Sequence, residues 1–101
     1  MSFWAASFDI VAAAATLADI NAEVVDALNT DTYGEPGQAN PPVSASLVTK
    51  IGYLYKNWRN RKTQTSTTFS LYADDGTTVD QKATVADDGT TASKTEVVTG
   101  P

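Results

Sequence analysis

The most regular pattern of apolar positions along the chain lies between residues 46 and 62. Hydrophobic side chains recur there at alternating spacings of four and three residues, like the a and d positions of a heptad. This spacing predicts one amphipathic helix with a narrow apolar seam. Ser46 precedes the seam, and its hydroxyl can accept a hydrogen bond from a free amide of the first helical turn. The seam residues are Leu47, Ile51, Leu54 and Trp58.

Residues 8–28 show a second helical pattern, because this stretch is rich in alanine and contains neither glycine nor proline. Two adjacent rows of apolar residues give it a surface too broad for an isolated helix, and its mixture of leucine and isoleucine favours a trimer or a larger bundle. We interpret residues 1–30 as a helical anchor and oligomerisation segment. Upstream of the helix, Phe3 and Trp4 either insert into a pocket or cover the end of the bundle. The predicted seam includes Ile10, Leu17, Ile20 and Val24.

Residues 31–45 are predicted to form a linker, because they hold three prolines and two glycines among mostly polar residues. The pair Pro41–Pro42 imposes an extended backbone and excludes a helix that continues from upstream. An irregular stretch of this length in a small domain is typical of functional loops and linkers. We expect it to let the two helices occupy different parts of one assembly.

The rest of the chain, to residue 101, shows a strand pattern. The sequence Ala-Asp-Asp-Gly-Thr-Thr occurs twice, and Asp-Gly between strand-like runs predicts β-hairpins. A three-residue loop with a left-handed Gly76 pairs Leu71 with Val79 and places Phe69 on the same apolar face. The predicted strands cover 66–73, 78–86 and 92–98.

These patterns predict an α+β protein with an N-terminal helix, a Pro/Gly linker, and a domain over residues 46–101 made of the second helix and a three-stranded antiparallel β-meander. Three strands alone are marginally stable, so the apolar face of the sheet needs a helix or another subunit against it. The chain contains no cysteine, which leaves oligomerisation as the usual reinforcement of a small core. We therefore expect an intertwined homotrimer, with a dimer or a higher ring as competitors.

The composition argues against catalysis. The chain has neither histidine nor cysteine, so the usual general bases, nucleophiles and zinc ligands are missing. The Asp-Asp-Gly turns lack the alternating ligands and the final glutamate of an EF-hand, and backbone preference alone explains aspartate before glycine. We predict a protein that is not an enzyme and that has no cofactor and no metal site.

The charge is distributed unevenly, with a net charge of −5 and five of the seven basic residues between positions 50 and 62. This basic segment, which includes Arg59 and Arg61, either faces solvent or pairs with an acidic surface on a neighbouring subunit. Beside Trp58 it also suggests nucleic-acid binding, but the acidic balance of the chain makes that partner unlikely. The apolar run at 8–15 is short and lacks positive flanks, so we expect neither a secretory signal nor a membrane span.

Several short motifs stand out in the sequence, namely Tyr33-Gly34-Glu35-Pro36-Gly37, Lys50-Ile51-Gly52-Tyr53-Leu54-Tyr55-Lys56, Trp58-Arg59-Asn60, Thr63-Gln64-Thr65 and the two Asp-Asp-Gly-Thr-Thr turns. They resemble a family of small virion proteins of tailed bacteriophages, and the resemblance covers roughly residues 33–98. It implies a non-catalytic structural protein located in the virion, whose partners are its own copies and other virion proteins. We prefer a capsid-associated fibre, decoration or cement role, with a tail, baseplate or tail-fibre component as the alternative. From another class, the alternative is a nucleic-acid-associated regulatory phage protein.

The sequence thus nominates twelve residues for contacts between subunits or with partners. They combine the two apolar seams, the aromatic pair near the N-terminus and two arginines of the basic segment. They are Phe3, Trp4, Ile10, Leu17, Ile20, Val24, Leu47, Ile51, Leu54, Trp58, Arg59 and Arg61.

Overall fold

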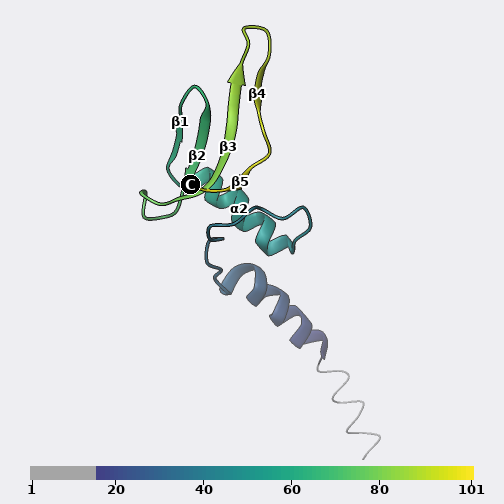
Figure 1. Cartoon of the computed structure of the whole chain (residues 1–101). Helices are drawn as coiled ribbons and strands as arrows, with labels where there is room; N and C mark the ends of the chain where they lie inside the picture. The colour runs from purple at the N-terminus through teal and green to yellow at the C-terminus, as the bar shows by residue number, and fades with distance from the viewer. Residues whose placement is uncertain (1–15) are drawn as a thin grey trace, which may run out of the picture. The chain divides into compact units, whose positions relative to one another are not determined.

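A computed structural model of the chain describes residues 16–101 and divides the chain into two compact units, residues 1–32 and 33–101 (Figure 1). In the first unit, residues 16–25 are α-helical and continue into a π-helical turn, η1 (Asp26–Thr30). The amide of Asp31 donates to the carbonyl of Asp26 at 2.6 Å and closes this turn. The predicted start of the helix at residue 8 lies outside the described residues, and its end falls two residues beyond the predicted residue 28.

The helix of the second unit, α2 (Leu47–Arg59), begins where the sequence predicts. The Ser46 hydroxyl accepts from the amide of Thr49 at 3.1 Å, which confirms the expected N-cap. The predicted end at residue 62 is wrong by three residues, because Asn60 already has an extended backbone. Its side chain donates to the Tyr72 carbonyl at 3.0 Å and so anchors the end of α2 to the sheet.

The sheet is antiparallel throughout and has five strands instead of the predicted three. Its order is β1-β2-β3-β4, and β5 pairs with the same edge of β3 as β4. The predicted meander is present as β2, β3 and β4, while β1 is an additional strand directly after α2. The strands are β1 (Lys62–Gln64), β2 (Thr68–Tyr72), β3 (Val79–Asp87), β4 (Ala92–Lys94) and β5 (Val98–Thr99).

The last predicted strand, 92–98, is interrupted between β4 and β5 by a side chain that takes part in the ladder. The Thr95 hydroxyl accepts from the amide of Thr84 at 3.0 Å, while the Thr95 amide donates to the Thr84 carbonyl at 2.9 Å. A hydroxyl thus replaces a backbone carbonyl at this point. The regular pairing stops there and resumes at β5.

The register of the first hairpin differs from the prediction, and the predicted apolar face is present only in part. Leu71 pairs with Gln81 instead of Val79, and Phe69 pairs with Ala83. The loop is one residue longer than predicted, and a bulge between Leu71 and Tyr72 adds a second residue. Beyond the bulge, the two one-residue shifts cancel, so Ala83 lies on the face of Phe69 and Leu71 as predicted. Val79 pairs with Tyr72 and lies on the other face, contrary to the prediction. Gly76 has φ +72°, as the predicted left-handed position requires.

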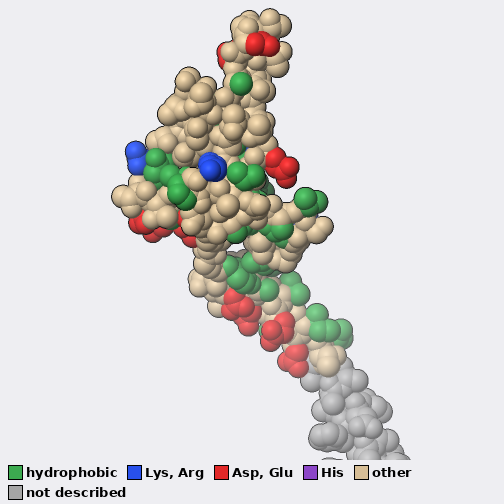
Figure 2. Space-filling model, in the orientation of Figure 1, with side chains coloured by type: hydrophobic (Ala, Val, Ile, Leu, Met, Phe, Trp, Pro, Cys, Tyr) green, Lys and Arg blue, Asp and Glu red, His purple; other side chains and the backbone are tan. Residues whose placement is uncertain are grey.

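The interior of the second unit is mainly polar. Among the described residues, only Leu71 and Ala83 are buried hydrophobic side chains, whereas Lys56, Asn60, Asp80 and Gln81 are all buried. On α2, the buried residue is Lys56, and the apolar seam faces solvent. Figure 2 shows hydrophobic side chains at the surface in the region of α2. The helix therefore turns its polar side toward the sheet.

Asp75 holds the first turn through its carboxylate, which accepts from the amides of Thr77 and Thr78 at 2.8 Å each. The hydrogen bond from the Thr78 amide is the main cause that lowers the pKa of Asp75 from 3.8 to about 2. A lowered pKa in the folded state adds stability above the unfolded pKa, and this stability is lost as the pH falls through the folded pKa. We expect Asp75→Asn to lower the urea midpoint at neutral pH, and we expect this deficit to shrink from pH 3.8 toward about 2.

The matched control for this prediction is Glu96→Gln, because Glu96 is an exposed carboxylate outside both turns. Urea unfolding followed by circular dichroism at neutral pH and at acidic pH measures both deficits. A deficit of Asp75→Asn that is equal at both pH values would contradict the role of the charged carboxylate.

Candidate functional site

A buried ion pair joins α2 to β3. The ammonium of Lys56 lies 2.6 Å from the Asp80 carboxylate and donates to the Pro36 carbonyl at 2.5 Å. Lys56 is 2% exposed and Asp80 is 5% exposed, so water screens this pair little. The pair connects three segments of the second unit: the stretch before α2, α2 itself and the sheet.

The segment around Pro36 is bound to the same unit by further hydrogen bonds. The Glu35 carboxylate accepts from the Asn60 side chain at 2.8 Å and from the Asp74 amide at 3.0 Å. The Gln81 amide nitrogen donates to the carbonyls of Gly37 at 2.9 Å and Ala39 at 3.2 Å. Residues 35–39 of the predicted linker therefore form part of the folded second unit.

The four apolar contact residues predicted on α2 are exposed, and one of them, Leu54, also borders the side of the helix toward the sheet. Leu47 is 70% exposed, Leu54 69% and Trp58 79%, and Ile51 is also exposed. Trp58 stacks on Tyr55, with ring centroids 5.9 Å apart, and does not fill the interior of its own chain. We call Leu47, Ile51, Leu54 and Trp58 the apolar seam of α2.

Only some of the contact residues predicted in and before the first helix lie within the described residues. Leu17, Ile20 and Val24 are exposed on the helix of the first unit. Phe3, Trp4 and Ile10 lie outside the described residues.

The arginines of the basic segment contact the turn at residues 73–78 of their own chain. Arg59 forms an ion pair with Asp74, and the hydrogen bond that its guanidinium donates to the Asp74 carboxylate is the main cause that raises the pKa of Arg59. The Arg61 guanidinium lies 4.4 Å from the centre of the Tyr72 ring and donates to the Gly76 carbonyl at 2.8 Å. These contacts order both side chains and occupy donors that could otherwise bind phosphate.

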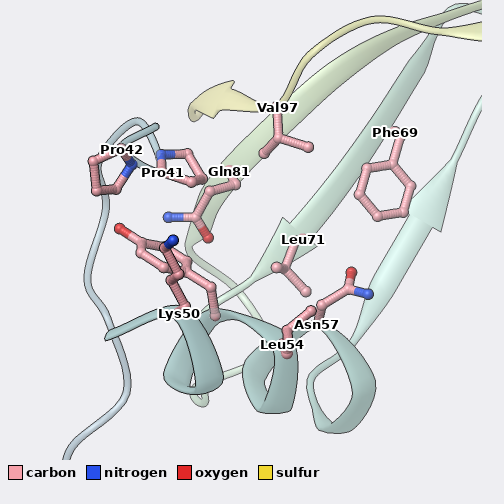
Figure 3. A pocket seen from close by; sticks show the side chains of 10 residues that line it. Pro41, Pro42, Lys50, Leu54, Asn57, Phe69, Leu71, Gln81 and Val97 are labelled. Atoms are coloured by element: carbon pink, nitrogen blue, oxygen red, sulfur yellow. The ribbon is translucent and has the colours of Figure 1, made fainter. Parts of the chain in front are cut away.

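A cleft of about 490 Å³ lies between α2, the sheet and the pair Pro41–Pro42 (Figure 3). The sequence pattern did not reveal this cleft, because it forms only when the proline segment folds back against β3. The one feature of the sequence that could have indicated the cleft was a glutamine at position 81, on an otherwise apolar face of the predicted sheet. The lining residues are Pro41, Pro42, Lys50, Tyr53, Leu54, Asn57, Phe69, Leu71, Gln81 and Val97.

Within residues 16–101, no group of three or more aspartates or glutamates is arranged to hold a metal ion. No helix in this range is long and apolar enough to cross a membrane. Comparison of the chain with protein-family models, curated protein sequences and solved structures finds no match.

Proposed function

We propose that the protein is a non-catalytic structural subunit of a tailed-bacteriophage virion, which acts by binding its own copies and other virion proteins. The observation that supports this most strongly is the distribution of apolar side chains. Within residues 16–101, Leu71 and Ala83 are the only buried hydrophobic residues, while the apolar seam of α2 is exposed. Exposed apolar surfaces of this kind mark protein contacts, and a small chain with little core gains stability from association.

The oligomer that we propose is a homotrimer, with a dimer or a higher ring as the competing states. The argument comes from the first helix, where Leu17 and Ile20 take successive seam positions of the a and d type. Leucine at a with isoleucine at d favours states larger than a dimer in parallel coiled coils. Both side chains are exposed in the first unit, so they are accessible to neighbouring copies.

The contacts of the basic segment favour protein binding over the rival function in nucleic-acid regulation. Lys56 is buried against Asp80, Arg59 pairs with Asp74, and Arg61 packs on Tyr72. Cations that serve internal contacts supply less of the counterion release that drives binding to nucleic acid. A salt-dependent shift in DNA mobility that is lost in the Arg59→Ala/Arg61→Ala variant would favour the rival.

Within the virion we propose a place on the capsid, as a fibre, a decoration or a cement protein. A short chain with a helical N-terminal unit and a separate α+β unit suits attachment by one unit and projection or cementing by the other. The alternative is a tail component, which needs the same kind of small symmetric part.

We expect mass spectrometry of separated heads and tails from the producing phage to find the protein in the head fraction, in multiple copies per particle. Copies in the tail fraction alone would refute the capsid placement and leave the structural role intact. Absence from both fractions would refute the structural role. The major capsid and tail-tube proteins of the same preparation are the controls for clean separation.

A further inference from the structure

The cleft beside α2 contains a buried hydrogen-bond acceptor that lacks a donor. Gln81 is 0% exposed, and its amide nitrogen is held by the carbonyls of Gly37 and Ala39. These two bonds fix the orientation of the amide, so its oxygen points away from them, toward the space between Leu71 and α2 (Figure 3). Within the described residues, Gln81 Oε1 accepts no hydrogen bond. A group that fills the cleft therefore binds best if it brings an N–H or O–H donor.

The walls of the cleft are suited to a flat apolar group. Pro41 and Pro42 lie beside Gln81, and Phe69 lies beyond Leu71 along the cleft (Figure 3). The volume of about 490 Å³ falls within the range of sites that enclose small ligands and is ample for one aromatic side chain.

The polar groups of the cleft indicate which aromatic side chain fits it best. An indole has one N–H donor and no acceptor, so it matches a single buried acceptor without adding a group that needs its own donor. A tyrosine hydroxyl would bring additional acceptor capacity, and a phenylalanine would leave Gln81 Oε1 unpaired. The exposed Lys50 stands at the side of the cleft formed by α2, where its ammonium attracts negative charge.

We propose that this cleft binds a tryptophan side chain presented by an acidic segment of a partner protein. The proposal rests on the binding function proposed above and names the chemistry of one partner contact. The indole N–H donates to Gln81 Oε1, the ring packs between Phe69 and the two prolines, and an acidic neighbour in the partner segment pairs with Lys50. No covalent step is involved.

The test uses the full-length chain and an acetylated peptide with one 5-fluorotryptophan flanked by aspartates. Fluorine NMR observes the peptide without interference from the protein's own tryptophans. We expect saturable binding to the parent chain, which weakens by about tenfold or more when phenylalanine replaces the tryptophan, because the buried acceptor then stays unpaired. Fluorinated phenylalanine supplies the same readout for this control peptide.

Two variants locate the binding site. Val97→Trp fills the cleft from its own chain and should abolish peptide binding. Lys50→Glu should lower the affinity for the aspartate peptide by about fivefold and raise the affinity for a peptide with lysines in place of the aspartates. Lys82→Glu makes the same charge change on the opposite face of β3 and should leave both affinities unchanged, because neighbouring strand residues point to opposite faces.

Three results would overturn the inference. The first is the absence of binding at about 1 mM peptide. The second is equal affinity for the tryptophan and phenylalanine peptides. The third is loss of self-association in Val97→Trp without peptide binding by the parent, which would assign the cleft to a second copy of the chain. If Val97→Trp still enters heads normally while the parent binds no peptide, the inference fails and the virion role stands. If the parent binds the peptide but is absent from the virion, the virion role fails and the cleft assignment stands.

Discussion

Replacing Lys56 with methionine is expected to lower the free energy of unfolding of the second unit by about 3–5 kcal/mol. Methionine keeps the length of the side chain and removes the ammonium that lies 2.6 Å from Asp80. Asp80 is 5% exposed, so its carboxylate would then be an uncompensated buried charge, and the Pro36 carbonyl would lose its donor as well. Breaking one side of a buried pair is costly for this reason, whether or not the intact pair adds net stability.

Urea unfolding followed by far-UV circular dichroism measures this effect, at one fixed protein concentration because stability depends on concentration wherever copies of a chain associate. Lys50→Met is the matched control, since Lys50 lies on the same helix and is exposed. The double variant Lys56→Met/Asp80→Leu should recover part of the loss, because it removes the orphaned charge. A Lys56→Met chain within about 1 kcal/mol of the parent would show that the ion pair does not support the fold.

Local signals in the sequence predicted those parts of the fold that depend on few neighbouring residues. The helix α2 begins after Ser46 because a hydroxyl at the N-cap satisfies a free amide within the same turn. Gly76 is left-handed because the Asp-Gly turn requires a positive φ there. Such features involve contacts over three or four residues, and the sequence displays both partners side by side.

Features that depend on distant contacts were missed. The helix stops at Arg59 because Asn60 bonds to Tyr72, twelve residues away, and this leaves room for β1. The pairing of Leu71 with Gln81 depends on a bulge that has no separate signature in the sequence. Local propensities cannot report such contacts, since they arise only when the segments meet.

The candidate site was likewise predicted only where it depends on local features of the sequence. The spacing of the apolar residues correctly grouped Leu47, Ile51, Leu54 and Trp58 on one face of α2. Spacing alone does not tell which face packs against the rest of the chain, and here it is the face with Lys56 that does so. The reason is that β3 presents Asp80 and Gln81 to the interior, and these groups require polar partners. The apolar seam is consequently exposed, and Leu54 also lines the cleft against the sheet.

Introducing a charge into either apolar seam is expected to disrupt assembly without unfolding the protomer. Ile51 is 53% exposed on α2 and Ile20 is 59% exposed on the first helix, so aspartate at either site remains hydrated in a free protomer. In a subunit interface the same carboxylate would lose its water and have no partner, at a cost of several kcal/mol. We therefore expect Ile51→Asp and Ile20→Asp each to weaken association by about a hundredfold or more.

Light scattering at micromolar concentration measures the mass of the parent and of both variants, and circular dichroism verifies that the helices persist. The control is Val43→Asp, because Val43 is a β-branched residue that is 89% exposed and lies outside α2 and the helix of the first unit. A parent mass of three protomers that falls to one in both variants, with Val43→Asp unchanged, is the expected result. If only Ile20→Asp dissociates, the first helix alone holds the oligomer, and the seam of α2 is then available to a different partner protein. A parent chain that is already a cooperatively folded monomer would contradict the proposed assembly, since the exposed seams would then have no partner among its own copies.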